Sequence, residues 1–200
     1  MMSSGERKYG RVSFPLSELF RLVTLNIRKR LGRSLLTTLS VLLAIAFMTV
    51  IFTLSSVNRA ATGAEFAAYQ FWLIFVALLV AGLGIFNSLL ISVAERYREI
   101  ATIKTLGAAD RHILLLYLIE SLVIGIIGGA LGVVIGLGVS IGLLAAYGRA
   151  ADIGLVPIVE YLYIMGQGLL YAAILSLVAT SYPSYHASKM SPAEAFRVEI

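Results

Sequence analysis

The amino-acid sequence predicts an all-α integral membrane protein with four transmembrane helices. Hydrophobic residues make up 59% of the 200 positions and charged residues only 14%, a balance that does not suit a water-soluble domain. A helix needs about 20 mostly apolar residues to cross about 30 Å of hydrocarbon, and four stretches meet that length. Cysteine is absent, which excludes disulfides and cysteine metal sites and gives no indication of redox compartment.

The four predicted spans follow in chain order. Residues 35–54 carry no charge, and each Leu, Ile, Val or Phe favours insertion by about 0.3–0.6 kcal/mol. Residues 69–93 are also free of charge. Residues 113–147 exceed what a bilayer requires, so we expect a tilt, a bend or turns that protrude into water. Residues 158–182 form the fourth span, which we expect to stop just before Pro183.

The basic residues predict the orientation. All of the 16 Lys and Arg residues except Arg59 and Arg149 precede the first span, separate the second from the third, or follow the fourth. Cytoplasmic loops carry such an excess, so we expect a multi-pass plasma-membrane protein with both termini in the cytoplasm. The net charge of +5 then indicates contact with anionic membrane lipid, and no nucleic acid partner is expected.

The segments outside the spans are short. Residues 13–30 alternate apolar and charged positions with Pro15 near the start, which predicts an amphipathic helix along the cytoplasmic interface. The apolar run of the first span exceeds the 7–15 residues typical of a signal peptide, so we expect an uncleaved span. The outer connections, residues 55–68 and 148–157, are far below the roughly 40 residues of a self-sustaining domain, and no external domain is expected.

The charged stretch ERYREIATIKTLGA at residues 95–108 interrupts two apolar runs. Its spacing predicts a short amphipathic helix over about 96–107, with Gly107 placed to end it. The apolar face comprises Ile100, Ile103 and Leu106. The charged residues that point elsewhere are Arg98, Glu99 and Lys104. Composition alone favours an ordinary connecting helix, with a binding role as the alternative.

Glycines recur through the third predicted span at small-xxx-small spacing, which lets helix backbones approach closely. They are Gly125, Gly128, Gly129, Gly132, Gly136, Gly138 and Gly142. The partner helix lies either in the same chain or in a second copy, and the spacing does not choose between them.

Glu120 stands about two turns into the third span, where a charge costs roughly 2.5–3.5 kcal/mol at the bilayer centre and less near its edge. Its functional interpretation is a proton or ion site. The favoured interpretation is structural: a neutral acid, or the partner of a base such as Arg33 or Arg111.

Catalytic and metal sites are not expected. Residues 138–142 match the G-x-S-x-G pattern of hydrolases, but that pattern requires a preceding strand and lies here in a glycine-rich apolar run. His112 and His186 are the only histidines, and both lie at predicted cytoplasmic ends, so neither an intramembrane triad nor a histidine metal cluster is expected. No lysine follows a glycine, so the phosphate-binding loop G-x-x-x-x-G-K-[ST] is absent.

Two stretches carry a family resemblance. Residues 87–108, followed by Arg111, Glu120 and the glycines, form the more specific one. Residues 182–197 form the other, and its matching positions include Pro183, Ala187, Pro192, Ala195 and Arg197. From about Leu25 onward the chain resembles the FtsX/MacB-like ABC-transporter permease family.

The resemblance implies a tail and amphipathic helix over residues 1–34 and a four-span permease domain over 35–200. It also implies a non-catalytic subunit that forms a dimer with a second permease copy and docks onto separate ABC ATPase subunits, which bind ATP and Mg while this chain binds no cofactor. Family members transmit movement across the membrane, and extrude or extract lipoproteins, peptides or macrolides, or activate a cell-wall hydrolase. By similarity, the coupling helix that meets the ATPase would use Glu95, Arg96, Arg98, Glu99, Ile100, Ile103, Lys104, Leu106 and Gly107.

One departure from the family pattern concerns the connection at residues 55–68, where relatives usually carry a large extracytoplasmic domain. Either a separate extracytoplasmic protein supplies that part, or the substrate is a lipid or short peptide taken from the membrane. A four-span membrane scaffold or assembly protein without an ATPase partner is the alternative function.

Overall fold

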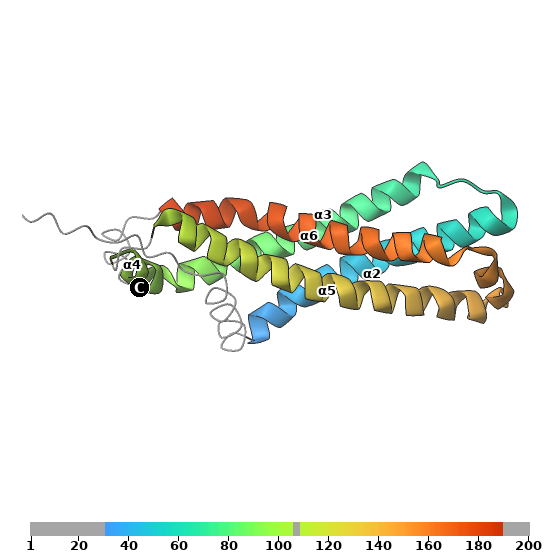
Figure 1. The fold of residues 1–200 in the computed structure, drawn as a ribbon, viewed down its shortest axis with the longest axis horizontal. Helices are drawn as coiled ribbons and strands as arrows, with labels where there is room; N and C mark the ends of the chain where they lie inside the picture. Colours follow the sequence, from blue (N-terminus) through green and yellow to red (C-terminus); the bar gives the residue numbers. More distant parts are fainter. Residues whose placement is uncertain (1–30, 106–108, 190–200) are drawn as a thin grey trace, which may run out of the picture.

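A computed structural model describes residues 31–105 and 109–189 as a bundle of four long helices (Figure 1). The long helices are α2 (Leu31–Thr62), α3 (Ala68–Glu95), α5 (Asp110–Ala146) and α6 (Ile158–Lys189). A short helix, α4 (Tyr97–Thr105), lies at one end of the bundle, and the 3-10 helix η1 (Ala150–Leu155) lies at the other. All four long helices are long and apolar enough to cross a membrane. The predicted all-α, four-span membrane fold is therefore confirmed.

Several predicted features lie outside the described residues. They are the amphipathic helix at 13–30, Leu106 and Gly107 of the predicted coupling helix, and Pro192, Ala195 and Arg197 of the C-terminal motif.

Helix α5 packs extensively against both α2 and α6, and α3 packs against the same two helices (Figure 1). The central cluster of buried side chains comprises Val41, Ile45, Ile85, Val133 and Ala172, drawn from all four helices. Large apolar side chains also cover the outside of the bundle, including Phe71 and Trp72 on α3. A helix bundle that is apolar outside as well as inside is suited to a lipid environment.

The glycines of α5 face neighbouring helices of the same chain. A Cβ atom added at Gly132 would lie 2.7 Å from the carbonyl oxygen of Leu42 on α2, and one at Gly129 would lie 2.5 Å from Cβ of Ala172 on α6. Gly128 and Gly136 face α2 in the same way, and Gly125 faces α6. Gly138 and Gly142 would meet nothing within 4 Å. Five of the seven predicted glycines therefore bring α5 close to α2 and α6, and Gly138 and Gly142 do not.

The fourth span does not stop before Pro183, because α6 continues as a helix to Lys189. Proline lacks an N–H and crowds the carbonyl one turn earlier, which usually ends or kinks a helix. Here Pro183 is buried, and the turn that follows carries the buried Ala187 into contact with Val93 and Tyr117. Tertiary packing of this last segment outweighs the local cost of the proline.

The end of the bundle opposite α4 is closed by a short connection. Arg149 Nη1 donates a hydrogen bond to Asn58 Oδ1 at 2.9 Å, and Arg149 Nε donates to Asp152 Oδ2 at 2.7 Å. Val156 packs against Val57 and Leu144 beneath them. These contacts tie α2, α5 and η1 together, and they explain why α2 remains helical to Thr62, beyond the predicted span.

We expect Gly132→Ala to lower the free energy of unfolding by about 1–3 kcal/mol, as overpacking of a buried site does. The matched change on the same helix, Gly138→Ala, should leave stability unchanged or raise it, because its Cβ meets open space and alanine favours helix. Thermal unfolding followed by circular dichroism in detergent would compare the two. Equal melting temperatures would contradict the assigned packing.

Candidate functional site

Helix α4 is the most charged of the described elements, and one face of it packs against its own chain. Ile100 is only 4% exposed and belongs to a cluster with Val93 of α3, Ile113 and Tyr117 of α5, and Ala187 of α6. Ala101, the next residue, is 2% exposed. Sequence reasoning placed Ile100 on an apolar face free to meet a partner, whereas in the structure Ile100 attaches α4 to the bundle.

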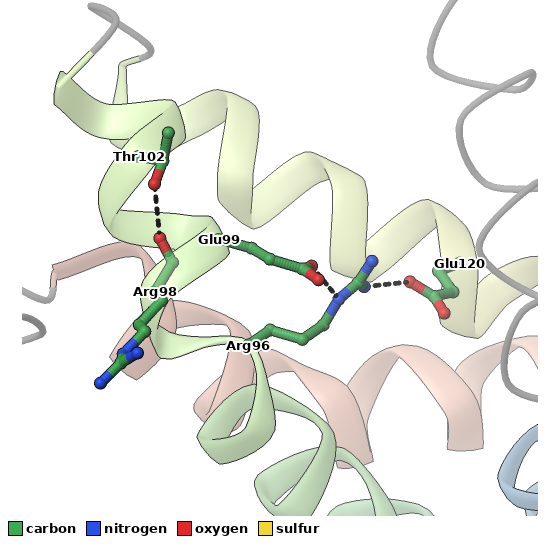
Figure 2. A network of polar contacts seen from close by, with 5 residues as sticks. All are labelled: Arg96, Arg98, Glu99, Thr102 and Glu120. Atoms are coloured by element: carbon green, nitrogen blue, oxygen red, sulfur yellow. Dashed lines mark hydrogen bonds and ion pairs between the residues drawn. The ribbon is translucent and has the colours of Figure 1, made fainter. Parts of the chain in front are cut away.

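Arg96 joins α3, α4 and α5 through ion pairs (Figure 2). Its Nε atom donates to Glu99 Oε2 at 2.9 Å, and its Nη1 atom lies 3.9 Å from Oε2 of Glu120. The side chains of Arg96 and Glu120 are 10% and 13% exposed. Burial alone would lower the pKa of Arg96, but Tyr117, Glu99 and Glu120 hold that pKa above its ordinary value. Arg96 therefore remains a cation between two acids.

Lys104 attaches the other end of α4. Its Nζ atom donates to the backbone carbonyl of Ser188 on α6 and lies 2.9 Å from Oδ1 of Asp110, the first residue of α5. Asp110 Oδ2 also lies 3.4 Å from Nζ of Lys189. The short helix is thus held at both of its ends by charged contacts to α5 and α6.

The outward face of α4 is polar. Arg98, Thr102 and Thr105 are exposed, and Thr102 Oγ1 donates to the carbonyl oxygen of Arg98 at 2.8 Å. Figure 2 shows the Arg98 side chain directed away from the Arg96–Glu120 pair. Glu95, at the end of α3, is also exposed. This set of side chains, which we name the outer α4 face, is available to a partner.

The structure therefore divides the residues that were predicted for coupling. Ile100, Arg96 and Lys104 hold α4 in place, Arg98 and Glu95 face outward, and Glu99 is exposed while bonded to Arg96. The side chain of Ile103 lies outside the described part of the chain. Pro183 and Ala187, from the C-terminal motif, are both buried in α6 near α4.

The structure places Arg96, a base not named from the sequence, beside Glu120, while the side chain of Arg33 lies outside the described part of the chain. We expected Arg33 or Arg111 to pair with Glu120. Arg111 is exposed. The sequence analysis also missed Asp110, which forms ion pairs with Lys104 and Lys189. An acid in the first turn of a predicted helix is a recognised stabilising position and could have indicated its importance.

The family model described as "FtsX-like permease C-terminal" matches residues 71–192. The chain belongs to the FtsX-like permease family. The match includes nearly all of α3 and the whole of α4, α5 and α6, so the outer α4 face and the contacts that support it lie within the family domain. The resemblance to ABC-transporter permeases seen in the sequence is confirmed.

Curated relatives of this FtsX-like permease carry ABC-transporter names. The macrolide export ATP-binding/permease protein MacB of Bdellovibrio bacteriovorus is 38% identical over 62% of this chain and 18% of the relative. The uncharacterized ABC transporter permease YknZ of Bacillus subtilis is 37% identical over 62% of this chain and 30% of the relative. This chain therefore spans less than a third of the length of either relative, and the matching region is the permease part.

We expect Arg96→Ala to destabilise the permease by about 3 kcal/mol, the lower end of the cost of breaking a buried ion pair. Arg98→Ala removes an exposed arginine two residues away and should change stability by no more than about 0.5 kcal/mol. Thermal unfolding in detergent compares them directly. A loss as large for Arg98→Ala as for Arg96→Ala would show that the buried pairs do not hold this end of the bundle.

Proposed function

We propose that this FtsX-like permease is the non-catalytic transmembrane subunit of an ABC transporter, coupling ATP hydrolysis on a separate ATPase subunit to export, extraction or mechanotransmission. One observation carries the proposal: α4 presents a polar outer face while its other face is fixed to α5 and α6. A helix held in this way passes a force from a partner to the long helices.

The outer α4 face suits a protein partner. Exposed charges of both signs, Arg98 and Glu95, lie beside the hydroxyls of Thr102 and Thr105. Charged groups of this kind set the register and rate of association, while burial of neighbouring apolar surface supplies much of the affinity. The ATPase subunits would bind the ATP and Mg, since this sequence contains no G-K pair for a phosphate-binding loop.

The proposed orientation places the α4 end in the cytoplasm, where the ATPase is. Arg98, Lys104, Arg111 and Lys189 belong to the α4 end of the bundle. Arg59 and Arg149 belong to the η1 end and are the only basic residues expected outside. This asymmetry agrees with the excess of basic residues in cytoplasmic loops.

A second permease copy and membrane lipid would cover the apolar outside of the bundle.

Only residues 63–67 separate α2 from α3, and η1 occupies most of the other connection at that end. We therefore propose a lipid or short peptide substrate taken from the membrane, or a separate extracytoplasmic protein that binds the substrate. The relatives named for macrolide export support export as the direction.

We expect the double substitution Arg98→Glu with Thr102→Glu to reduce co-purification of the ABC ATPase at least tenfold, because it removes the positive charge of the outer α4 face and adds two negative charges. The matched control is Arg59→Glu with Thr62→Glu, in the last turns of α2 at the η1 end of the bundle. Both pairs are exposed, and Thr62 Oγ1 donates to the carbonyl one turn earlier as Thr102 Oγ1 does.

The measurement is affinity purification of the tagged permease in mild detergent, with co-purifying chains identified by mass spectrometry. Unchanged recovery of the ATPase with the α4 double variant would contradict docking at this face. Absence of any ABC ATPase from the wild-type preparation would contradict the whole proposal and would favour the four-span scaffold.

A further inference from the structure

A partly open cavity lined by both hydroxyl-bearing and apolar residues lies between the four long helices, in the half of the bundle nearer to α4. Neither the fold nor the proposed docking explains it. It offers about 50 Å³ to the centres of water-sized molecules. All four long helices contribute hydroxyl groups to its lining, among them those of Thr37, Ser88, Ser121 and Thr180. The carboxylate-bearing residue Glu120 lines it as well. Ser and Thr are common between membrane helices, whereas an ionisable residue such as Glu120 is rare there.

One of these hydroxyls lacks a hydrogen-bond partner among the described residues. Thr180 is 0% exposed, and its Oγ1 atom has no hydrogen-bond partner among the described residues. A buried hydroxyl without a partner costs free energy, and native structures satisfy nearly all such groups with protein or ordered water. Because Thr180 lines the cavity, a molecule bound there can reach it.

A second polar contact bridges the cavity wall. Thr37 Oγ1 on α2 and Ser88 Oγ on α3 form a hydrogen bond of 2.8 Å. That bond uses one hydroxyl hydrogen, and a hydroxyl oxygen can accept up to two hydrogen bonds. The cavity therefore presents both donors and acceptors.

The size and chemistry of the cavity match water. A water molecule needs at least about 10–15 Å³ of such volume and two to four polar partners, so 50 Å³ admits roughly three molecules. An apolar ligand would leave Thr180 Oγ1 without a hydrogen-bond partner. An anion would meet Glu120, and no Lys or Arg is among the described residues that line the cavity.

We propose that this cavity is an internal binding site for about three water molecules, which bond the Thr180 hydroxyl and solvate Glu120 beside its pair with Arg96. The water site gives Glu120 hydrogen-bond partners that do not move with α4. Arg96 can then separate from Glu120 without leaving the carboxylate in a dry environment. The site exists whether or not α4 binds an ATPase.

Cysteine accessibility tests the site, since the natural chain contains no cysteine. Ser176 and Ser140 form a matched pair: they are 1% and 0% exposed, and each hydroxyl donates to a carbonyl of its own helix. Ser176 lines the cavity and Ser140 does not. A thiol reacts through its thiolate, which apolar surroundings suppress, so reaction with a small aqueous cation reports hydration.

We expect Ser176→Cys and Thr180→Cys to react with silver ions at least tenfold faster than Ser140→Cys. The permease is held in nanodiscs in chloride-free buffer, and unreacted thiols are counted with a maleimide dye after denaturation. The two lining positions are tested separately, so if one variant misfolds, the reaction rate of the other still tests the proposal. Rates at the lining positions as slow as that of Ser140→Cys would overturn the proposal, and so would a Ser140→Cys rate as fast as theirs.

A second matched pair tests the hydrogen bonds. Thr180 and Thr53 are 0% and 1% exposed, and neither Oγ1 has a partner among the described residues, but Thr53 does not line the cavity. If water bonds Thr180, Thr180→Val should lower the melting temperature by about 2 °C or more, whereas Thr53→Val should leave it unchanged or raise it. The proposal would be overturned if Thr180→Val raised the melting temperature as much as Thr53→Val does.

Discussion

The close approach of α5 to α2 and α6 is the constraint on which the other contacts of the bundle depend. In lipid there is no hydrophobic drive to bring helices together, because the lipid tails are as apolar as leucine, so short-range packing must supply the attraction. Gly128, Gly132 and Gly136 expose backbone to α2, and Gly125 and Gly129 expose it to α6. Any larger side chain at these positions would move α5, and with it every group that α5 positions at its two ends.

Helix α4 shows what depends on that placement. At nine residues it is shorter than the 12–15 residues at which an isolated helix becomes even marginally stable in water. Its stability must come from tertiary contacts, and α5 supplies most of them through Asp110, Tyr117 and Glu120. A shift of α5 would therefore displace or unfold α4, and a displacement of α4 would act on α5 through the same side chains.

The sequence was sufficient to predict the four transmembrane spans, because long runs without charge insert readily into a bilayer. It was insufficient for contacts between helices. Periodicity assigns a residue to a face of its own helix, but the pairing of Glu120 with Arg96 requires the relative rotation of α5 and α3. The cavity was equally hidden, since its hydroxyls come from four helices and each alone is an ordinary helix residue. The length of α6 beyond Pro183 depended on packing around Ala187, which local propensity does not include.

The two ends of the bundle differ in how readily their contacts exchange. At the η1 end, Arg149 makes two short hydrogen bonds, at 2.7 and 2.9 Å, and apolar packing lies beneath them. At the α4 end, Arg96 approaches Glu120 only to 3.9 Å, and Glu120 also borders a cavity rich in hydroxyls. The α4 end also has short contacts of 2.9 Å, from Arg96 to Glu99 and from Lys104 to Asp110. The longer Arg96–Glu120 pair costs less to separate than these short contacts. The glycine contacts with α2 and α6 lie along α5 between these two ends.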